Sequence, residues 1–296
     1  MSNPWVAIQR NPTSGKGNRA SLIKDLIHHL RLQGIRPRLF SNRERMQAQL
    51  QERSVEEQPL CIVAAGGDGT VQEMINRYPD QRVAILPLGT ENLLARYLGI
   101  PKSGQLVAEM ICKGETRKID LCQINDRKFI LMASIGFDAA VVLDLSLIRK
   151  GNISHLSYLK PIWKTIWSYS YEPLQIITEQ QELTAYDVIV VNIPAYGLNL
   201  NFAPQAQDHD GQFDLVLFEK KGLWNMLKYV FQIIRGTHLN SDGVQVLHAK
   251  EIQIQSAHPV PVQTDGDATG TTPIKIKIIP SGAQFIVPCS TRVNVQ

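Results

Sequence analysis

The stretch Leu60-Cys-Ile-Val-Ala-Ala-Gly-Gly-Asp-Gly-Thr70 decides the fold class of this chain. Its first six residues form a continuous apolar run, which is typical of a strand buried on both faces of a parallel sheet. The glycines end that strand, and the residues from Thr70 to Arg77 have the pattern of a helix. Glycines here let a ligand approach main-chain N–H groups, and a helix N-terminus attracts anions. The stretch therefore predicts a strand–loop–helix unit with an anion site.

The same alternation recurs on both sides of this stretch. Strands are expected over 5–9, 36–40, 60–65 and 83–86, and helices over 19–32, 43–53, 70–77 and 92–98. A second loop, Pro87-Leu-Gly-Thr-Glu-Asn92, also lies between a strand and a helix. Alternating strands and helices predict an α/β domain with a mostly parallel sheet, in which both loops converge on one crevice.

The pattern changes after about residue 120. Strands are expected over 119–135, 174–178, 184–193, 213–219, 250–255, 274–279 and 284–287, with two helical inserts at about 155–171 and 222–235. Successive strands without crossover helices predict an antiparallel, sandwich-like domain. We therefore expect an α/β domain over 1–122 and a larger β-rich domain over 123–283, with the tail 284–296 rejoining the first.

Composition narrows the function classes. The chain has 296 residues, 44% of them hydrophobic, which excludes a disordered protein. Its four cysteines lack CxxC spacing, so neither a zinc knuckle nor a redox pair is indicated. The sequence shows no signal peptide and no apolar run of about 20 residues, so we expect a cytoplasmic protein. A net charge of +4 is too small to indicate nucleic acid, but it suits polyanionic ligands or an anionic membrane surface.

Three carboxylate-bearing loops are candidates for chemistry. Asp68 would be repelled by phosphate unless it met a cation or a hydroxyl proton, which points to a Mg²⁺–nucleotide or phosphoryl-transfer site. The alternative is an Asp-Gly turn with a capping aspartate. Asp265-Gly-Asp267 can equally be a plain hairpin turn, and the segment around Asp208 and Asp210 a solvated turn. The fragment at 14–17 is no Walker loop, because Gly17 stands where Ser or Thr is needed.

Five segments together resemble a known family. They are Asn11-Pro-Thr-Ser-Gly15, Gly66-Gly-Asp-Gly-Thr70, Leu88-Gly-Thr-Glu-Asn92, Asp208-His-Asp-Gly-Gln-Phe-Asp214 and Asp265-Gly-Asp267. In order and spacing they resemble the diacylglycerol-kinase catalytic domain family, in its soluble bacterial lipid-kinase branch. Sphingosine kinases share the pattern, and NAD kinases are more distant relatives. The resemblance extends over nearly the whole chain.

This resemblance implies ATP- and Mg²⁺-dependent phosphorylation of a lipid hydroxyl. The nucleotide contacts that it implies are Asn11, Pro12, Thr13, Ser14, Gly15, Ser41, Gly66, Gly67, Asp68, Gly69, Thr70, Val71, Gln72 and Thr90. The acidic catalytic residues that it implies are Asp68, Asp120, Asp265 and Asp267. A structural Mg²⁺ would be held by backbone oxygens of Gln207 and Gln212 and by the carboxylate of Asp210.

Two positions depart from the family pattern. Many members have Gly-Asn-Asp where this chain has Glu91-Asn-Leu93, so the acidic group of the second loop is displaced. The family's DGE segment ends here in Asp267, one methylene shorter. Either Asp265 or Asp267 can then be the general base, and we prefer Asp267 because it occupies the family's base position.

The lipid side of the chain is less distinctive. Trp163, Trp167 and Tyr169, with Lys160 and Lys164, suit a peripheral anchor on an anionic membrane, or else a helix packed on the second domain. The apolar segment 223–234 can form a wall of an acyl pocket, or simply core. The expected partners are ATP and a lipid, diacylglycerol or a related one, without nucleic acid and with a homodimer left open. A kinase of a soluble hydroxyl compound, such as a nicotinamide dinucleotide, and an inactive nucleotide-binding regulator remain alternatives.

Overall fold

The computed structural model describes residues 4–11, 19–52, 54, 57–148, 167–195, 197 and 200–289. Its contacts divide the chain into two compact units, Met1–Ile119 with Ser281–Gln296, and Asp120–Pro280. The chain leaves the first unit within strand β5 (Thr116–Ile124) and returns to it within strand β16 (Ile274–Ile286).

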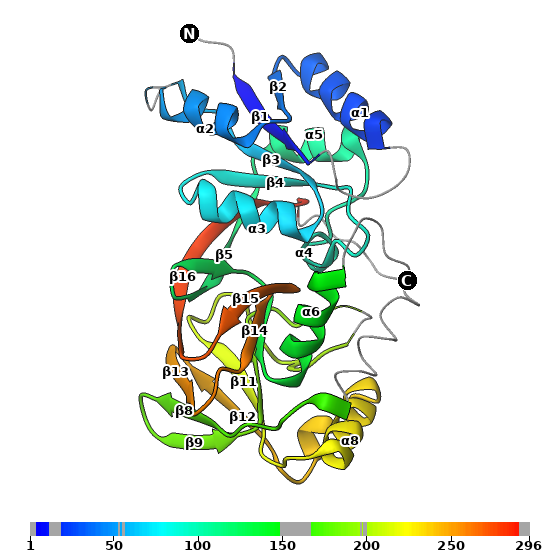
Figure 1. Ribbon diagram of the computed structural model, residues 1–296. Coiled ribbons are helices and arrows are strands. Elements are labelled where there is room, and N and C mark those ends of the chain that lie inside the picture. The colour runs from blue at the N-terminus through cyan, green and yellow to red at the C-terminus, as the bar shows by residue number, and fades with distance from the viewer. Residues whose placement is uncertain are drawn as a thin grey trace. The chain divides into compact units, whose positions relative to one another are not determined.

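The first unit is built on a parallel sheet with the strand order β2-β1-β3-β4 (Figure 1). The strands are β1 (Trp5–Arg10), β2 (Arg36–Phe40), β3 (Ile62–Gly66) and β4 (Arg82–Pro87). Because these four strands pair in parallel, their carboxyl ends lie along one edge of the sheet. The far end of β16 adds a parallel neighbour to β4, with Gln284 opposite Arg82.

Helices alternate with these strands. They are α1 (Arg19–Leu32), α2 (Arg43–Gln51), α3 (Asp68–Arg77), α4 (Leu93–Tyr97) and α5 (Gly104–Lys113). Helix α1 has the predicted bounds and buries the apolar positions Ile23, Leu26 and Leu30. Helix α5 was not predicted. It packs against α1 so closely that a Cβ at Gly104 would lie 2.4 Å from the nitrogen of Leu26.

The second unit is a sandwich of two sheets. One sheet has the order β12-β11-β10-β7-β14-β15. The other contains the pairings β16-β13-β8-β9, and β5 pairs with β16 on one side and with β6 on the other. The remaining bounds are β6 (Arg127–Phe129), β7 (Met132–Ile135), β8 (Leu174–Thr178), β9 (Glu182–Ala185), β10 (Asp187–Val191), β11 (Phe213–Phe218), β12 (Val244–Ala249), β13 (Glu251–Ser256), β14 (Pro261–Thr264) and β15 (Asp267–Thr271). Alternate residues of both sheets, such as Phe213, Leu215, Ile252 and Ile254, form one buried core.

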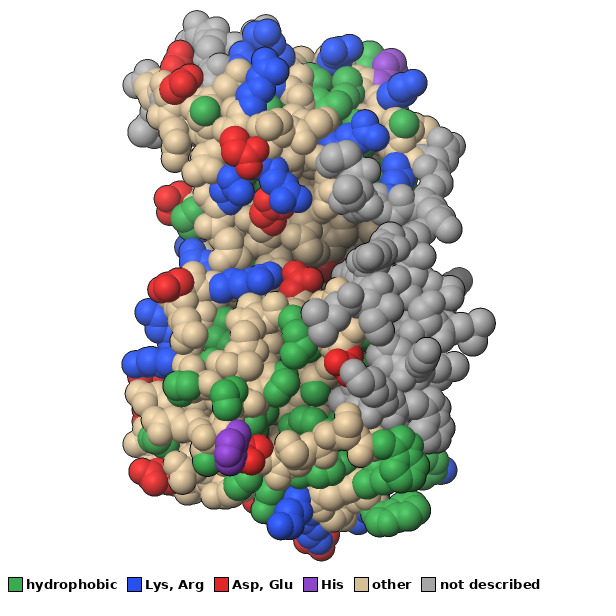
Figure 2. Space-filling view, in the orientation of Figure 1, with side chains coloured by type: hydrophobic (Ala, Val, Ile, Leu, Met, Phe, Trp, Pro, Cys, Tyr) green, Lys and Arg blue, Asp and Glu red, His purple; other side chains and the backbone are tan. Residues whose placement is uncertain are grey.

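Among the described residues, the sandwich is accompanied by α6 (Phe137–Ile148), α8 (Leu223–Ile234) and a 3₁₀ turn at His238–Asn240. Apolar side chains gather on the surface over α8 (Figure 2). The expected α/β domain and antiparallel sandwich are both confirmed. Helix α6 and strands β12, β14 and β15 were not predicted. The strands expected over 274–279 and 284–287 form the single strand β16, and most of the helix expected over 155–171 lies outside the described residues.

Candidate active site

The parallel strands of the first unit bring most of the predicted nucleotide contacts to one edge. At this edge Gln9 pairs with Phe40, Arg10 with Ala65, and Gly66 with Pro87. We call the residues at and beyond these strand ends the glycine edge, namely Asn11, Ser41, 66–70 and 87–92. The predicted contacts Pro12, Thr13, Ser14 and Gly15 lie outside the described residues.

The two glycine loops of this edge touch each other through their backbones. A Cβ at Gly89 would lie 2.5 Å from the Cα of Gly67, and a Cβ at Gly67 would lie 3.1 Å from the Cα of Gly89. The N–H of Leu88 donates to the carbonyl of Gly66 at 2.8 Å. Glycine at positions 67 and 89 is therefore a steric requirement of the contact between the loops.

Asp68 joins the two loops through its carboxylate. Its Oδ2 accepts the N–H of Leu93 and its Oδ1 accepts the N–H of Leu94, both at 3.1 Å. These are among the amides that a helix leaves without partners at its N-terminus. Burial raises the pKa of the Asp68 carboxyl above its usual value, although both amides act in the opposite direction. Asp68 thus caps α4, a helix other than the one on which it lies.

The remaining predicted contacts of this edge differ in what they offer a ligand. Gly69 and Thr90 are exposed, whereas Thr70, Val71 and Gln72 are buried in α3. The Asn11 amide nitrogen lies 3.5 Å from the Thr70 hydroxyl, so the first loop also reaches this point. The edge can therefore present mainly backbone groups and short polar side chains to an anion.

The predicted metal loop, residues 207–212, belongs to the second unit and is tied to Asp120. The Asp120 Oδ2 accepts the N–H of Gly211 at 2.7 Å, and the Asp120 N–H donates to the carbonyl of Asp208 at 2.7 Å. Asp210 is exposed and accepts the N–H of Gln212 at 3.0 Å. Asp120 therefore supports the acidic loop directly.

The two carboxylates of the 265–267 turn have different surroundings. Asp265 has a φ of 50° and accepts the N–H groups of Ile130, Leu131 and Met132 at 2.8–3.1 Å. Its two oxygens are therefore engaged by the backbone that enters β7. Asp267 has a side chain that is 48% exposed, and its carboxylate accepts a hydrogen bond from Arg127 at 3.1 Å. Of this pair, Asp267 is the one that a substrate can approach.

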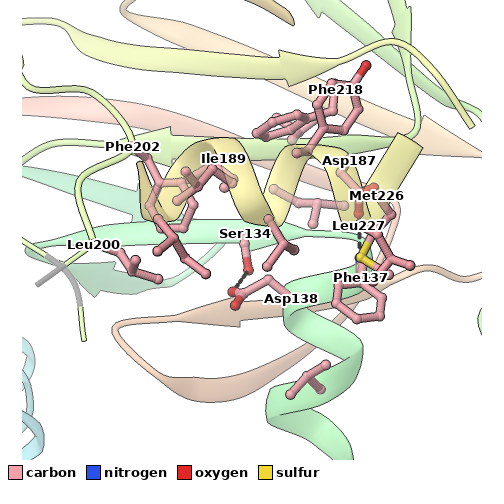
Figure 3. Close-up of a pocket in the computed structure, with 17 residues that line it drawn as sticks. Ser134, Phe137, Asp138, Asp187, Ile189, Leu200, Phe202, Phe218, Met226 and Leu227 are labelled. Carbon is pink, nitrogen blue, oxygen red and sulfur yellow. Dashed lines mark hydrogen bonds between the residues drawn. The ribbon is translucent and has the colours of Figure 1, made fainter. Parts of the chain in front are cut away.

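An apolar cavity of about 520 Å³ lies in the second unit, beside α6 and α8 (Figure 3). Its polar members are few, and its apolar lining includes Ile135, Phe137, Val141, Val188, Ile189, Leu200, Phe202, Phe218, Met226, Leu227, Val230, Ile233 and Ile234. Such a space suits aliphatic chains, because every apolar group that enters it leaves water. The expectation that 223–234 walls an apolar pocket agrees with this lining.

The polar side of the cavity is linked to the 265–267 turn. Ser134 donates to Asp138 at 2.6 Å, and the Gln263 amide nitrogen lies 2.9 Å from the Ser134 hydroxyl and 3.1 Å from the Asp138 carboxylate. The other end of the Gln263 amide accepts the N–H of Gly266 at 2.8 Å. One buried glutamine therefore connects the cavity wall to the turn that carries Asp267.

Asp187 is a second carboxylate on the cavity wall. It accepts the N–H of Phe137. Burial, and to a smaller extent repulsion from Asp138, raises the pKa of Asp187 to about 7, against the lowering effect of the Phe137 amide. The described lining contains two carboxylates and no lysine or arginine, so the cavity is unsuited to an anionic ligand group.

Two family models match the chain over nearly its whole length. That of the diacylglycerol kinase catalytic domain covers residues 6–124, and that of the YegS C-terminal NAD kinase beta sandwich-like domain covers residues 132–287. The chain belongs to the diacylglycerol kinase catalytic domain family. The resemblance seen in the five segments is thereby confirmed.

Curated relatives agree with this assignment, and solved structures share the fold. The diacylglycerol kinase of Bacillus subtilis (strain 168) is 28% identical over 221 residues, 72% of each chain. That of Staphylococcus haemolyticus (strain JCSC1435) is 27% identical over 274 residues, 89% of this chain and 82% of the relative. A crystal structure of a diacylglycerol kinase from Bacillus anthracis str. Sterne has a TM-score of 0.72 at 22% identity, covering 98% of this chain and 99% of that one. The last comparison shows the fold.

The structural Mg²⁺ that the sequence resemblance implies can be weighed against the donors of the 207–212 loop. Mg²⁺ prefers oxygen ligands, and the exposed Asp210 carboxylate with neighbouring backbone carbonyls supplies that chemistry. Among the described residues, no group of three or more His, Cys, Asp or Glu side chains is placed to hold a metal. The chemistry of these donors would suit a magnesium ion that keeps several waters, and Asp210 would then be its side-chain ligand.

Sequence reasoning missed the polar wall of the cavity, formed by Ser134, Asp138 and Asp187, and the buried Gln263 that bonds to the first two of them. One local signal was available, because Gly136 and Asp138 follow a short apolar run much as Gly67 and Asp68 do. Gly136 has a φ of 127°, and a Cβ there would lie 2.1 Å from the Asp187 carboxylate. Asp187 and Gln263 are distant from Asp138 in the sequence, so only the fold brings Asp187 to this wall and Gln263 into contact with Ser134 and Asp138.

Proposed function

We propose that this family member is an ATP- and Mg²⁺-dependent lipid kinase that transfers the γ-phosphate of ATP to a lipid hydroxyl, with diacylglycerol or a related lipid as acceptor. The observation that carries the proposal is the hydrogen-bonded path from the Asp267 turn through Gln263 to the wall of the apolar cavity. It joins a carboxylate suited to general-base chemistry to a space suited to acyl chains.

Asp267 is the base in this proposal. It accepts the proton of the acceptor hydroxyl while the hydroxyl oxygen forms its bond to the γ-phosphorus and the bond to the leaving ADP oxygen breaks. The proton then passes from Asp267 to solvent, which its exposure allows. Asp265 is unsuited to this role because its oxygens accept three backbone amides. Arg127 donates to Asp267 and holds the orientation of its carboxylate.

The glycine edge would bind the nucleotide. Glycine at positions 67, 69 and 89 leaves the loop backbone without Cβ atoms that would shield it, although the Gly89 N–H itself donates to the Asn92 side chain. The N-terminus of α3 adds a positive dipole end. Mg²⁺, when bound, neutralises charge on the phosphate oxygens. We assign Asp68 to holding the loops in register, with Ser41, Gly69 and Thr90 on the exposed side of the edge, and Asp120 to supporting the 207–212 loop.

The test is a transfer assay with γ-labelled ATP, Mg²⁺ and a panel of lipids in mixed micelles. Label in the organic phase that depends on Asp267 supports the proposal. Label in a water-soluble product would indicate a kinase of a soluble hydroxyl compound. ATP binding without transfer to any acceptor would indicate a nucleotide-binding regulator. Omission of Mg²⁺ from the same assay tests the metal requirement.

A further inference from the structure

Helix α8 carries an exposed apolar face. Trp224 is 83% exposed, Phe231 58% and Ile234 66%, and Leu227 lies on the same face at 38%. These four residues are spaced three, four and three apart, which places them along one side of the helix. The opposite side holds the buried Met226 and Tyr229, and Tyr229 packs against Phe218 with ring centroids 4.9 Å apart. The exposed face is therefore separate from the side of α8 that packs on the sandwich.

Large apolar side chains gathered on one surface indicate a binding surface. The apolar patch over α8 is visible as a group of neighbouring side chains (Figure 2). Leu227, Val230 and Ile234 belong both to this exposed surface and to the cavity lining. The patch is thus continuous with the cavity, and an apolar chain could pass between them without crossing a polar barrier at these residues.

The charges around α8 favour one kind of partner. Lys221, Lys228 and Arg235 are exposed on or beside the helix, and Arg235 lies 5.3 Å from the Phe231 ring centroid. Lys220 pairs with Asp242, and Glu219 is the other acid nearby in the sequence. A basic rim around an apolar face with an exposed tryptophan matches an anionic bilayer. Two copies of the chain meeting through α8 would instead bring equal positive rims together.

We propose that α8 docks the protein on the surface of an anionic phospholipid bilayer, with Trp224 and Phe231 inserted at headgroup depth and Lys221, Lys228 and Arg235 among the lipid phosphates. Among the helices that the structure describes, none combines the length and the apolar character of a transmembrane span. The surface is distinct from the segment 158–171, most of which lies outside the described residues. That docking supplies a lipid substrate rests on the proposed function. That α8 binds a bilayer does not depend on it.

The test is co-sedimentation with vesicles of phosphatidylglycerol and phosphatidylcholine, compared with vesicles of phosphatidylcholine alone. The double variant Trp224→Ala/Phe231→Ala should bind the anionic vesicles about tenfold or more weakly than wild type. The control variant Leu32→Ala/Leu106→Ala removes two apolar side chains that are 69% and 44% exposed in the first unit, and it should bind as wild type does. Equal binding by wild type and the α8 variant overturns the proposal.

A second variant tests the charge contribution. Lys221→Glu/Lys228→Glu should lose the preference for anionic vesicles while its melting curve stays that of wild type, since both residues are exposed. An unchanged preference contradicts the proposal. So does a wild-type dimer in sedimentation velocity that dissociates in the Trp224→Ala/Phe231→Ala variant, because a second copy would then cover the face.

Activity assays on two forms of the substrate distinguish a failure of the docking proposal from a failure of the proposed function. Trp224 and Phe231 do not line the cavity, so their variant should phosphorylate a short-chain, water-dispersed diacylglycerol at the wild-type rate. The same variant should lose most of its activity on diacylglycerol embedded in vesicles. A wild type that phosphorylates neither substrate refutes the proposed function, and the docking proposal is then still decided by co-sedimentation. Equal loss on both substrates contradicts the docking role.

Discussion

The glycine edge of the first unit is built from backbone contacts, whereas the apolar cavity of the second unit is built from side chains. At the glycine edge, side chains are absent where the loops meet, and Gly67 and Gly89 approach through their backbones. Among the described residues, the cavity is made of side chains from two helices and three strands, together with loop residues such as Leu200 and Phe202. An added atom should therefore damage the edge, whereas the cavity should respond to a change of volume or charge.

The Asp265–Asp267 turn combines both kinds of construction within three residues. Asp265 supports the backbone, as the glycines do, and Asp267 presents a functional group, as the cavity wall does. This pair gives the sharpest contrast between a residue that holds the structure and one that acts on a substrate.

The largest effect is expected from Asp267→Asn. If Asp267 is the general base, the variant should lose about 10²–10⁴-fold in kcat, because the amide cannot accept the hydroxyl proton. Its melting temperature should stay close to that of wild type, since the side chain is half exposed. The measurement is lipid phosphorylation alongside a thermal melt, with Asp126→Asn, an exposed carboxylate of the same unit, as the control. Full activity in Asp267→Asn would exclude it as the base.

Asp265→Ala should act through stability. The buried N–H groups of Ile130, Leu131 and Met132 would lose their acceptor, and alanine is strained at the left-handed φ of 50°. We expect a loss of roughly 3 kcal/mol in the free energy of unfolding. Asp265→Asn, which tolerates this φ and keeps one acceptor oxygen, should lose less. Urea unfolding measures these losses. A wild-type unfolding midpoint for Asp265→Ala would mean that the three hydrogen bonds of Asp265 do not stabilise the fold.

The fold was predictable where the sequence pattern is local. Buried strand runs followed by glycine identified the parallel sheet, and a repeating apolar face gave the bounds of α1. Helix α6 was not predicted because its apolar residues lie on nearly every side and therefore show no helical period. Its sequence is Phe-Asp-Ala-Ala-Val-Val-Leu-Asp-Leu-Ser-Leu-Ile. The hairpin of β14 and β15 was visible only as its Asp-Gly turn, because β15 (Asp-Ala-Thr-Gly-Thr) lacks apolar alternation.

In the candidate site, too, local motifs could be predicted from the sequence, whereas contacts between distant residues could not. The glycine loops and the acidic turns could be found from short motifs, since each lies within a few residues of a strand end. The roles of their carboxylates could not. Asp68 caps a helix that begins 25 residues later, and Asp265 binds amides more than 130 residues earlier in the chain. Which of Asp265 and Asp267 faces solvent depends on those distant partners.

Gly89→Ala tests whether the glycine edge depends on close backbone contact. The new Cβ would lie 2.5 Å from the Cα of Gly67, so the loops must separate. We expect a loss of about 2 kcal/mol in stability and weaker ATP binding, measured by unfolding and by calorimetric titration. Gly69→Ala is the matched control for stability, because a Cβ there meets nothing within 4 Å. Because Gly69 lies in α3, where alanine is favoured over glycine, Gly69→Ala should leave the free energy of unfolding unchanged or slightly higher.

The smallest effect concerns pH and the cavity wall. Burial raises the pKa of Asp187 to about 7 in the folded protein, well above the value of about 3.9 that an unfolded chain has. Between these values the folded state holds more protons than the unfolded state, so this group lowers the stability progressively as pH rises from about 4 to 7. Below pH 4 the group is protonated in both states and contributes nothing.

Asp187→Asn removes this titration while keeping an oxygen that can accept the N–H of Phe137. Relative to wild type, the variant should gain about 1–2 kcal/mol in the free energy of unfolding between pH 4.5 and pH 7.5, a value reduced because the cavity leaves Asp187 partly exposed. Urea unfolding at several pH values measures the difference, with the exposed Asp80→Asn as control. A difference between variant and wild type that stays constant across this range would mean that Asp187 is already ionised at pH 4.5. The cavity wall would then carry two full negative charges at neutral pH, and its polar side would favour a cationic headgroup over a neutral one.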